Sequence, residues 1–346
     1  MPKRGILLVN LGSPTSTSIP DVRRYLGEFL MDPFVIDSPW PIRKIVVAGF
    51  ILPFRPKRTA HAYERIWEAT GSPLLRHSRE LRDALAQRVK SPIELAMRYG
   101  VPSIAEAVRR LLDAGVGEIV LVPLYPHHAD STRTTTIVAV RKVLARLGST
   151  VGVTVVPPFY ADPPYLDVLA GSIERAMPDD TQLLLFSYHG LPERHITAAD
   201  PTGNHCLRSP DCCERPSPAH ATCYRHQVFE TSRGVASRLN LTPERWRVSF
   251  QSRLGRLPWL TPYTDQMLDR LPGEGIERLT VACPAFVADN LETLEEIGLT
   301  GRERFLAAGG KRFTLVPCLN AAPAWADVLA KWCVADHAAA RAARAR

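Results

Sequence analysis

The sequence lacks any apolar run long enough to cross a bilayer. Its longest uncharged apolar stretch covers residues 45–54, far short of the roughly 20 residues that a spanning helix needs. The chain start also lacks the apolar core and small-residue cleavage site of a signal peptide, because Met1 to Arg4 lead directly into a strand-like run. We therefore expect a cytoplasmic protein without a membrane anchor.

Acidic residues are fewer than basic ones. The chain has 35 Asp and Glu against 43 Lys and Arg, a formal net charge of +8, and the terminal sequence HAAARAARAR holds part of the excess. No nucleic-acid recognition motif accompanies this charge, so we expect no nucleic-acid partner and favour attraction to anionic lipid or an acidic substrate. With 45% hydrophobic and 23% charged residues in 346, the chain is predicted to be globular and long enough for two domains.

Cysteine is sparse except in one segment. Cys283, Cys318 and Cys333 lie in apolar contexts and are predicted core residues. The other four lie close together in the sequence, at Cys206, Cys212, Cys213 and Cys223. In a reducing compartment such a group indicates metal rather than disulfides. Four thiolates suit a 2Fe-2S cluster or zinc, although adjacent cysteines are unusual for zinc. Unliganded thiols, or a mixed set with His205, His220 and His226, stay open.

The chain contains an internal repeat. The segment TVVPPFYADPPYLDVLA (154–170) matches TLVPCLNAAPAWADVLA (314–330), and LVNLGSP (8–14) lies over FSYHGLP (186–192). Apolar strand-like runs, each followed by a helical pattern, occur at 5–10, 93–98, 118–123, 152–157, 182–188, 246–251, 278–283 and 312–317. This alternation is typical of parallel sheets covered on both faces. We predict an α/β fold of two similar Rossmann-like halves, each a four-stranded parallel sheet flanked by helices.

Candidate functional residues follow the predicted strands, where ligands of parallel sheets bind. His189 ends the fifth strand, and imidazole there can act as a base near neutral pH or bind a metal. After the seventh strand, Asp289, Glu292 and Glu296 recur at i, i+3 and i+7, which predicts a helix with one acidic face. A path that delivers a metal cation or removes protons would use such a stripe.

Five segments resemble the signature sequences of ferrochelatases in wording, order and spacing. They are LLVNLGSP, YPHHADST, SYHGLPERH, FQSRLGRLPWLTPYTD and FVADNLETLEEI, and together they span nearly the whole chain. The resemblance implies a chelatase-like fold and an enzyme, a lyase that inserts Fe(II) into a porphyrin in haem biosynthesis. It also implies that His189 and Glu292 are the catalytic pair, with Asp289 and Glu296 extending the metal path. The residues that match the porphyrin cleft are Leu11, Arg98, Tyr125 and Trp259.

Metallation of a porphyrin removes two pyrrole protons, so a base and a carboxylate relay are both needed. We favour His189 as proton acceptor over metal ligand, since a strong ligand would retain the iron, and Glu292 and Glu296 as the relay. In the family, a tyrosine at the position of Leu11 often accompanies coproporphyrin. The apolar Leu11 favours protoporphyrin IX.

The resemblance also bears on two segments and on the domain boundaries. The cysteine segment resembles a bacterial subgroup with all four 2Fe-2S ligands in one insertion, so we assign the four cysteines to such a cluster. Residues 38–58 resemble the lip of the porphyrin mouth, which could rest on the inner face of the membrane, or they form an ordinary amphipathic core helix. Predicted domains are 1–160, 161–323 with the insertion 202–223, and a C-terminal helix, 324–346, packed on the N-terminal half.

Three alternatives to a protoporphyrin ferrochelatase remain. The first is a coproporphyrin ferrochelatase, and the second is a chelatase that loads cobalt or nickel into a related tetrapyrrole. The third is a non-catalytic metal or tetrapyrrole carrier. The sequence specifies no oligomeric state.

Overall fold

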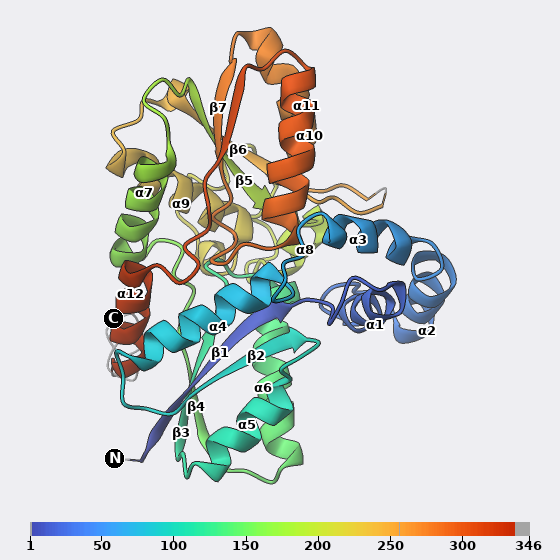
Figure 1. Ribbon diagram of the computed structural model, residues 1–346, viewed down its shortest axis with the longest axis vertical. Helices are drawn as coiled ribbons and strands as arrows, with labels where there is room; N and C mark the ends of the chain where they lie inside the picture. Colours follow the sequence, from blue (N-terminus) through green and yellow to red (C-terminus); the bar gives the residue numbers. More distant parts are fainter. Residues whose placement is uncertain (1, 256, 336–346) are drawn as a thin grey trace. The chain divides into compact units, whose positions relative to one another are not determined.

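The computed structural model describes residues 2–255 and 257–335 and divides into two compact units (Figure 1). Unit 1 contains the described residues up to Leu124, then Ser131–Pro157, and those from Asn320 on. Unit 2 contains Tyr125–Asp130 and Pro158–Leu319. The basic tail at 337–346, with the end of the predicted C-terminal helix, lies outside the described residues.

Unit 1 is built on a four-stranded parallel sheet of order β2-β1-β3-β4. Its strands are β1 (Arg4–Gly12), β2 (Ile93–Tyr99), β3 (Glu118–Pro123) and β4 (Gly152–Val155). The central strand β1 is buried on both faces, which explains its continuous run of apolar residues. Helices α4 (Pro73–Ala86), α5 (Ile104–Asp113) and α6 (Thr135–Arg146) pack against these strands, and α12 (Pro323–Val334) belongs to the same unit.

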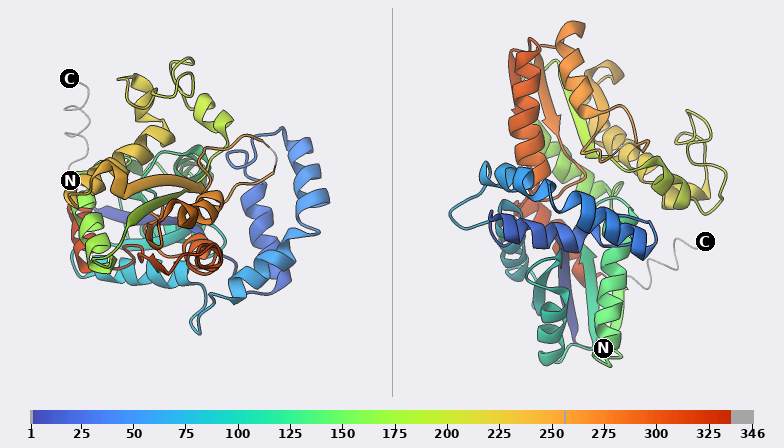
Figure 2. Two further views of the ribbon diagram at one scale, coloured as in Figure 1. Left: turned by 90° about the horizontal axis from the view of Figure 1, so that it is seen from above. Right: turned by 90° about the vertical axis from the view of Figure 1, so that its right-hand side faces the viewer.

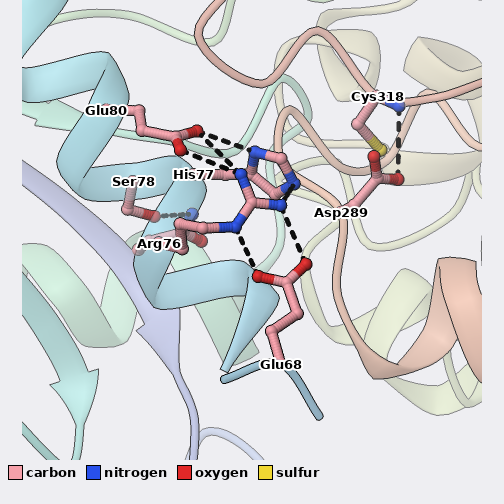
Figure 3. Close-up of polar contacts among 8 residues, drawn as sticks. Glu68, Arg76, His77, Ser78, Glu80, Asp289 and Cys318 are labelled. Carbon is pink, nitrogen blue, oxygen red and sulfur yellow. Dashed lines mark hydrogen bonds and ion pairs between the residues drawn. The ribbon is translucent and has the colours of Figure 1, made fainter. Parts of the chain in front are cut away.

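Local sequence explains these helices. Ser103 and Glu106 form a capping box at the start of α5, and its apolar residues recur at helical spacing and pack on the strands. On α4, Arg76 binds Glu68 and Glu80 and so fixes the first turn (Figure 3). Helix α12 packs against α4.

A helical segment precedes α4 in unit 1. It comprises α1 (Ile19–Leu30), α2 (Trp40–Lys44), the π-helix η1 (Ile45–Ile51) and α3 (Arg55–Glu64), and α1 packs against η1 and α3 (Figure 2). The segment 38–58 is therefore two short helical pieces followed by the start of α3. It is not one buried amphipathic helix, because five of its large apolar side chains are exposed: Trp40, Ile42, Ile45, Phe50 and Phe54.

Unit 2 repeats the topology of unit 1 with the order β6-β5-β7-β8, again all parallel. Its strands are β5 (Leu183–His189), β6 (Trp246–Gln251), β7 (Arg278–Ala282) and β8 (Arg312–Leu315). Helices α7 (Pro163–Ala176) and α9 (Tyr224–Arg238) pack together. Its other helices are α8 (Glu193–Ala198), α10 (Thr264–Arg270) and α11 (Arg302–Ala307), with 3-10 turns η3 (Pro218–Ala221), η4 (Pro243–Arg245) and η5 (Leu271–Glu274).

The predicted fold class is confirmed. All eight predicted strands are present, and the second sheet has the same strand order as the first, as a duplicated unit requires. Among the described residues, helices of the length and apolarity needed to span a bilayer are absent.

The predicted acidic α-helix differs from the structure. Asp289 precedes the helix, and Glu292–Gly301 forms the π-helix η6. Another π-helix, η2 (Asp130–Thr134), follows β3. Single π-helical turns break the regular ladder of an α-helix and are frequent at functional sites. The i, i+3, i+7 spacing therefore predicted a helix at the right place, but the helix is a π-helix and it begins after Asp289.

Candidate functional site

His189 is the last residue of β5, beside Gln251 at the end of β6. Its ring is half-buried, with its centroid 6.5 Å from that of Phe286. Its Nδ1 lies 2.6 Å from the carbonyl oxygen of Gly190. Since a carbonyl only accepts, Nδ1 carries the proton, and the lone pair of the neutral ring lies on Nε2. The imidazole is thereby oriented to accept a proton at Nε2.

Asp289 lies in the segment between β7 and η6, where it is buried. Its Oδ1 accepts a hydrogen bond from the backbone N–H of Cys318, at 3.2 Å (Figure 3). It also accepts one from Oγ1 of Thr293, at 3.0 Å. The carboxylate thus ties the β7 end to the segment after β8. Burial raises the pKa of the Cys318 thiol well above its usual value, and the charge of Asp289 adds to this effect.

Glu292 and Glu296 belong to the helix that follows. The Asn290 side chain accepts from the backbone N–H of Glu292, at 2.9 Å, and of Thr293, at 3.1 Å, which caps the helix start. Glu296 accepts from the backbone N–H of Ser252, at 2.8 Å, and from the Ser252 hydroxyl. Burial raises the pKa of Glu296 to about 7, the Ser252 hydrogen bonds oppose this shift, and the charge of Glu292 adds to it.

The end of β6 connects the histidine to these carboxylates. Gln251 is the register partner of His189, and its Nε2 lies 3.4 Å from the backbone oxygen of Glu292. The next residue, Ser252, holds Glu296 and has a φ of 66°. This left-handed conformation is costly for a residue other than glycine. Two consecutive residues therefore contact both parts of the site: Gln251 pairs with His189, and Ser252 binds Glu296 of the acidic helix.

Trp259 and Tyr125 also lie in unit 2. Trp259 is half-buried, its Nε1 donates to the Leu254 carbonyl at 2.9 Å, and its ring reaches the backbone at Gly190. A side chain at Gly190 would meet this ring at 3.3 Å and the Gln251 oxygen at 3.0 Å. Tyr125 follows β3 and is 7% exposed. Trp259 therefore lies directly beside the residue that follows His189.

Leu11 and Arg98 lie at the carboxyl ends of β1 and β2 in unit 1. The two strands pair Asn10 with Met97 and Gly12 with Tyr99, so Leu11 and Arg98 are neighbours. Arg98 is bound to the buried Asp32 and, through Nε, to Thr135 Oγ1 at 2.7 Å. The sequence alignment of the two halves sets Leu11 at the position of His189.

The four clustered cysteines lie in unit 2, between α8 and α9, and are all buried. Asp200 organises the segment. One carboxylate oxygen accepts from the backbone N–H groups of His205 and Cys206, at 2.8 and 2.9 Å, and the other from the N–H and hydroxyl of Thr202. Burial opposes the charge, but these hydrogen bonds outweigh it and hold the Asp200 pKa below its usual range.

The thiols influence one another. Interaction with Cys223 raises the pKa of the Cys213 thiol, and burial raises it further. Burial raises the pKa of the Cys206 thiol, and Cys223 opposes this shift. Arg225 lies against the sulfurs of Cys212 and Cys213, at 3.5 and 3.3 Å. The structure brings the four residues together, although no three His, Cys, Asp or Glu side chains in residues 2–255 and 257–335 are arranged to hold one metal ion.

The neighbouring histidines bind backbone oxygens. His205 and His220 each direct Nε2 to the Cys212 carbonyl, at 2.6 and 3.1 Å, and His226 directs Nδ1 to the Cys213 carbonyl at 2.8 Å. The rings of His220 and His226 stack at 3.6 Å. The imidazoles thus shape the loop that carries the thiols.

Sequence reasoning missed four supporting residues: Gln251, Ser252, Tyr224 and Asn290. Asn290 had a readable signal, because asparagine before a helical run is a typical cap. Ser252 and Gln251 had none, since their partners are more than 40 positions away. Tyr224 donates its hydroxyl to the His189 carbonyl at 2.8 Å, a contact that only the fold creates.

Comparison with solved structures identifies the fold. SirB from Bacillus subtilis with Fe3+ superposes with a TM-score of 0.54 at 12% identity, covering 97% of this chain and 98% of that one. The sirohydrochlorin chelatase SirB from B. subtilis subspecies spizizenii, in complex with cobalt, gives the same TM-score at 9% identity. The two four-stranded parallel sheets therefore form the fold of the metal chelatases.

Sequence comparison is more specific. The profile of the ferrochelatase family matches residues 3–337. The ferrochelatase of Azotobacter vinelandii is 53% identical over 335 residues, 96% of this chain and 99% of that protein. That of Opitutus terrae is 50% identical over 344 residues. The chain belongs to the ferrochelatase family, and so to the metal-chelating lyases.

Proposed function

We propose that this enzyme inserts Fe(II) into protoporphyrin IX to give protohaem, with His189 accepting pyrrole protons and Glu292 and Glu296 relaying them. The single observation that carries the proposal is the end of β6, where Gln251 pairs with His189 and Ser252 binds Glu296. A base with a free Nε2 lone pair and a protonatable carboxylate thus share one anchor. Metallation needs both groups, because two protons leave as the cation enters.

Asp289 has a supporting part in this proposal. Its carboxylate already accepts two hydrogen bonds, so it holds the β7 end and the helix start in place while adding negative charge to the metal path. Glu296 has a pKa of about 7. A group that is half protonated near neutral pH exchanges protons in both directions, as a relay requires.

The porphyrin assignment rests on the apolar Leu11, with Arg98, Tyr125 and Trp259 as contacts to the macrocycle. A tetrapyrrole with vinyl edges suits an apolar side chain at position 11. A coproporphyrin ferrochelatase is the alternative, and competition between the two porphyrins separates them. We expect a kcat/KM at least severalfold higher for protoporphyrin IX, and a preference for coproporphyrin would reverse the assignment.

One anaerobic assay tests the reaction itself. Protein, Fe(II) and protoporphyrin IX are mixed, and the Soret and visible bands are followed over time. Repeated turnovers are expected, whereas a single stoichiometric change would identify a carrier. His189→Ala should lose at least about a hundredfold in kcat, the contribution of a general base. His61→Ala, an exposed histidine, is the matched control.

We further propose that Cys206, Cys212, Cys213 and Cys223 hold a 2Fe-2S cluster. The chemistry of the donors supports this proposal, because four buried thiols lie in one segment and Arg225 lies against two of the sulfurs, where its charge would offset that of thiolates. Such a cluster supplies electron-transfer or sensing chemistry, which a redox-neutral insertion does not use. Visible absorption, iron and acid-labile sulfide in fresh protein test this. Colourless protein with stoichiometric zinc, or with free thiols, would refute it.

We propose also that segment 38–58 rests on an anionic membrane surface, at its cytoplasmic face. Phe50 and Phe54 are 70% and 76% exposed, while Arg43 turns inward to the carbonyls of Ile36 and Ser38, at 3.0 and 2.8 Å. Soluble proteins usually bury large apolar side chains and expose charged ones. The exposed Phe50 and Phe54 and the inward Arg43 reverse this pattern and favour contact with a membrane interface.

Sedimentation with anionic vesicles tests this contact. The double substitution Phe50→Ser with Phe54→Ser should abolish co-sedimentation. Leu147→Ser with Leu306→Ser, which also removes two exposed apolar side chains, should leave it intact. Equal binding by both variants would exclude the segment as the membrane contact.

A further inference from the structure

Tyr224 connects two features that the proposed reaction treats separately. It is the first residue of α9 and follows Cys223 directly, and its hydroxyl donates to the His189 carbonyl at 2.8 Å. Cys223 itself caps α9, because its sulfur accepts from the backbone N–H of His226 at 3.5 Å. The backbone of Tyr224 thus follows the cysteine segment directly, and its hydroxyl contacts the backbone of the candidate base His189.

The hydrogen bond acts on the peptide that orients the imidazole. The peptide between His189 and Gly190 offers one oxygen and one N–H. Tyr224 binds the oxygen, and the Gln251 carbonyl accepts from the N–H at 2.8 Å. The next carbonyl, that of Gly190, holds Nδ1 of the His189 ring. Rotation of this peptide would therefore turn the imidazole, and Tyr224 is one of the two contacts that resist it.

Contacts around α9 hold Tyr224 in a fixed position. The ring of buried His127 packs edge-on against Tyr224 and Tyr188, with centroids 5.6 and 5.5 Å apart, and its Nε2 binds Thr231 on α9 at 2.9 Å. Gln227 on the same helix accepts from the backbone N–H of His128 at 2.7 Å. Because these contacts pack α9 tightly, a displacement of its start would also move Tyr224.

The start of α9 is in turn held by the cysteine segment. The hydroxyl of Thr222 donates to the Ala199 carbonyl at 2.6 Å. On α9 itself, Arg225 lies 3.3 Å from the Cys213 sulfur, and Nδ1 of His226 lies 2.8 Å from the Cys213 carbonyl oxygen. A change at Cys213 would therefore act on α9 through Arg225 and His226, and a change at Cys223 would act on the residue directly before Tyr224.

We propose that Tyr224 is a positioning residue that couples the cysteine segment to His189. The state of the four thiols sets the start of α9, and the Tyr224 hydroxyl transfers that state to the peptide that orients the imidazole. This inference rests on the proposed role of His189. It assigns the cysteine segment a regulatory influence on the reaction without a part in the chemistry.

Tyr224→Phe tests this coupling, with Tyr188→Phe as the matched control. Tyr188 contacts the same His127 ring, but its hydroxyl binds Ser232 on α9, at 2.8 Å, instead of His189. We expect Tyr224→Phe to lower kcat about three- to tenfold, the effect of one lost hydrogen bond, with the KM for iron and porphyrin unchanged. Tyr188→Phe should leave kcat near the wild-type value.

A spectroscopic readout separates this inference from the proposed function. The Cε1–H proton resonance of His189, assigned by its loss in His189→Gln, should move in Tyr224→Phe and in Cys206→Ser but not in Tyr188→Phe. In the double variant, Cys206→Ser should add little to the shift caused by Tyr224→Phe, because both act through one hydrogen bond. Additive shifts, or an unmoved resonance in Tyr224→Phe, would overturn the coupling even if the enzyme turned over normally.

Discussion

Glu296 is the residue whose protonation the fold changes most clearly within the candidate site. Burial raises its pKa to about 7 from a usual value of 4.5, and the repulsion of Glu292 adds to this. Between these two pH values the folded protein binds a proton that the unfolded chain has released. The free energy of unfolding that depends on this group therefore falls as pH rises from about 4.5 through about 7.

Glu296→Gln should remove that pH dependence. The variant should match the wild type near pH 4 and exceed its free energy of unfolding above pH 7, by at most on the order of 3 kcal/mol. Urea unfolding at a series of pH values measures the difference. Glu303→Gln, an exposed carboxylate on α11, is the control and should not change the slope. A wild-type slope in Glu296→Gln would show that the carboxylate titrates normally.

The same substitution should separate stability from catalysis. Glutamine keeps an oxygen to accept from the Ser252 N–H but cannot exchange a proton, so we expect a large loss of kcat together with the gain in stability. Activity is measured by the Soret assay at pH 7 to 8. Unchanged turnover would remove Glu296 from the relay and leave Glu292 as its acidic member.

At the scale of the element, one carboxylate orders the first part of the cysteine segment. Asp200 accepts from three backbone N–H groups and one hydroxyl, and it draws His205 and Cys206 into the fold. The segment has little regular structure of its own, with only the short turn η3 before α9. The Asp200 network closes the part of the loop that carries the buried Cys206.

Asp200→Asn should open the segment without unfolding the enzyme. The amide keeps one acceptor oxygen, so about half of the hydrogen bonds are lost, and we expect faster reaction of Cys206 with a thiol reagent in protein freed of metal. Asp211→Asn, which loses a surface ion pair with Arg215 in the same segment, should react at the wild-type rate. Equal rates in all three proteins would assign the ordering to the thiols or their ligand.

The helix η6 offers a second element-scale prediction. Asn290 satisfies two backbone N–H groups at its start, and loss of such a cap costs about 1 kcal/mol. Asn290→Ala should lower the free energy of unfolding by that amount, as measured in urea. Asn290→Asp should retain most of it. Equal losses in both variants would mean that the amide has another role.

At the scale of the whole molecule, the two units repeat one architecture. Leu7 in β1 and Leu185 in β5 occupy equivalent positions in the aligned halves, and each is 0% exposed in the core cluster of its own unit. The same residue type therefore fills the same structural position twice. The free energy lost when a buried leucine is truncated depends on how far its surroundings relax into the cavity. Truncation of Leu7 and of Leu185 therefore compares the rigidity of the two cores.

Leu7→Ala and Leu185→Ala should each lower the free energy of unfolding by about 2–5 kcal/mol. Chemical denaturation followed by fluorescence measures both, with Leu147→Ala, which is 37% exposed, as the control. A near-neutral effect of either core substitution would indicate that the corresponding strand is not a core strand.

How much the sequence predicted depended on the range of the interactions. The eight strands were readable, because a strand buried on both faces must be apolar throughout, as β1 and β5 are. The carboxylates were readable as a group next to a helix, and Glu292 and Glu296 do lie in one, but the π-helical form of η6 and the place of Asp289 before it were not readable. The left-handed turn at Ser252 carried no signal, since serine does not favour that conformation.

The sequence by itself determined the repeated α/β units, the strand ends at which His189 and the acidic residues lie, and the grouping of four cysteines in one segment. These follow from local patterning and from short spacing along the chain. Only the tertiary structure decided which distant groups meet, namely Ser252 with Glu296, Gln251 with Glu292, and Tyr224 with His189. These contacts form because a parallel sheet brings the ends of strands that are far apart in the sequence to one edge. Backbone and side-chain groups meet there that no local pattern encodes.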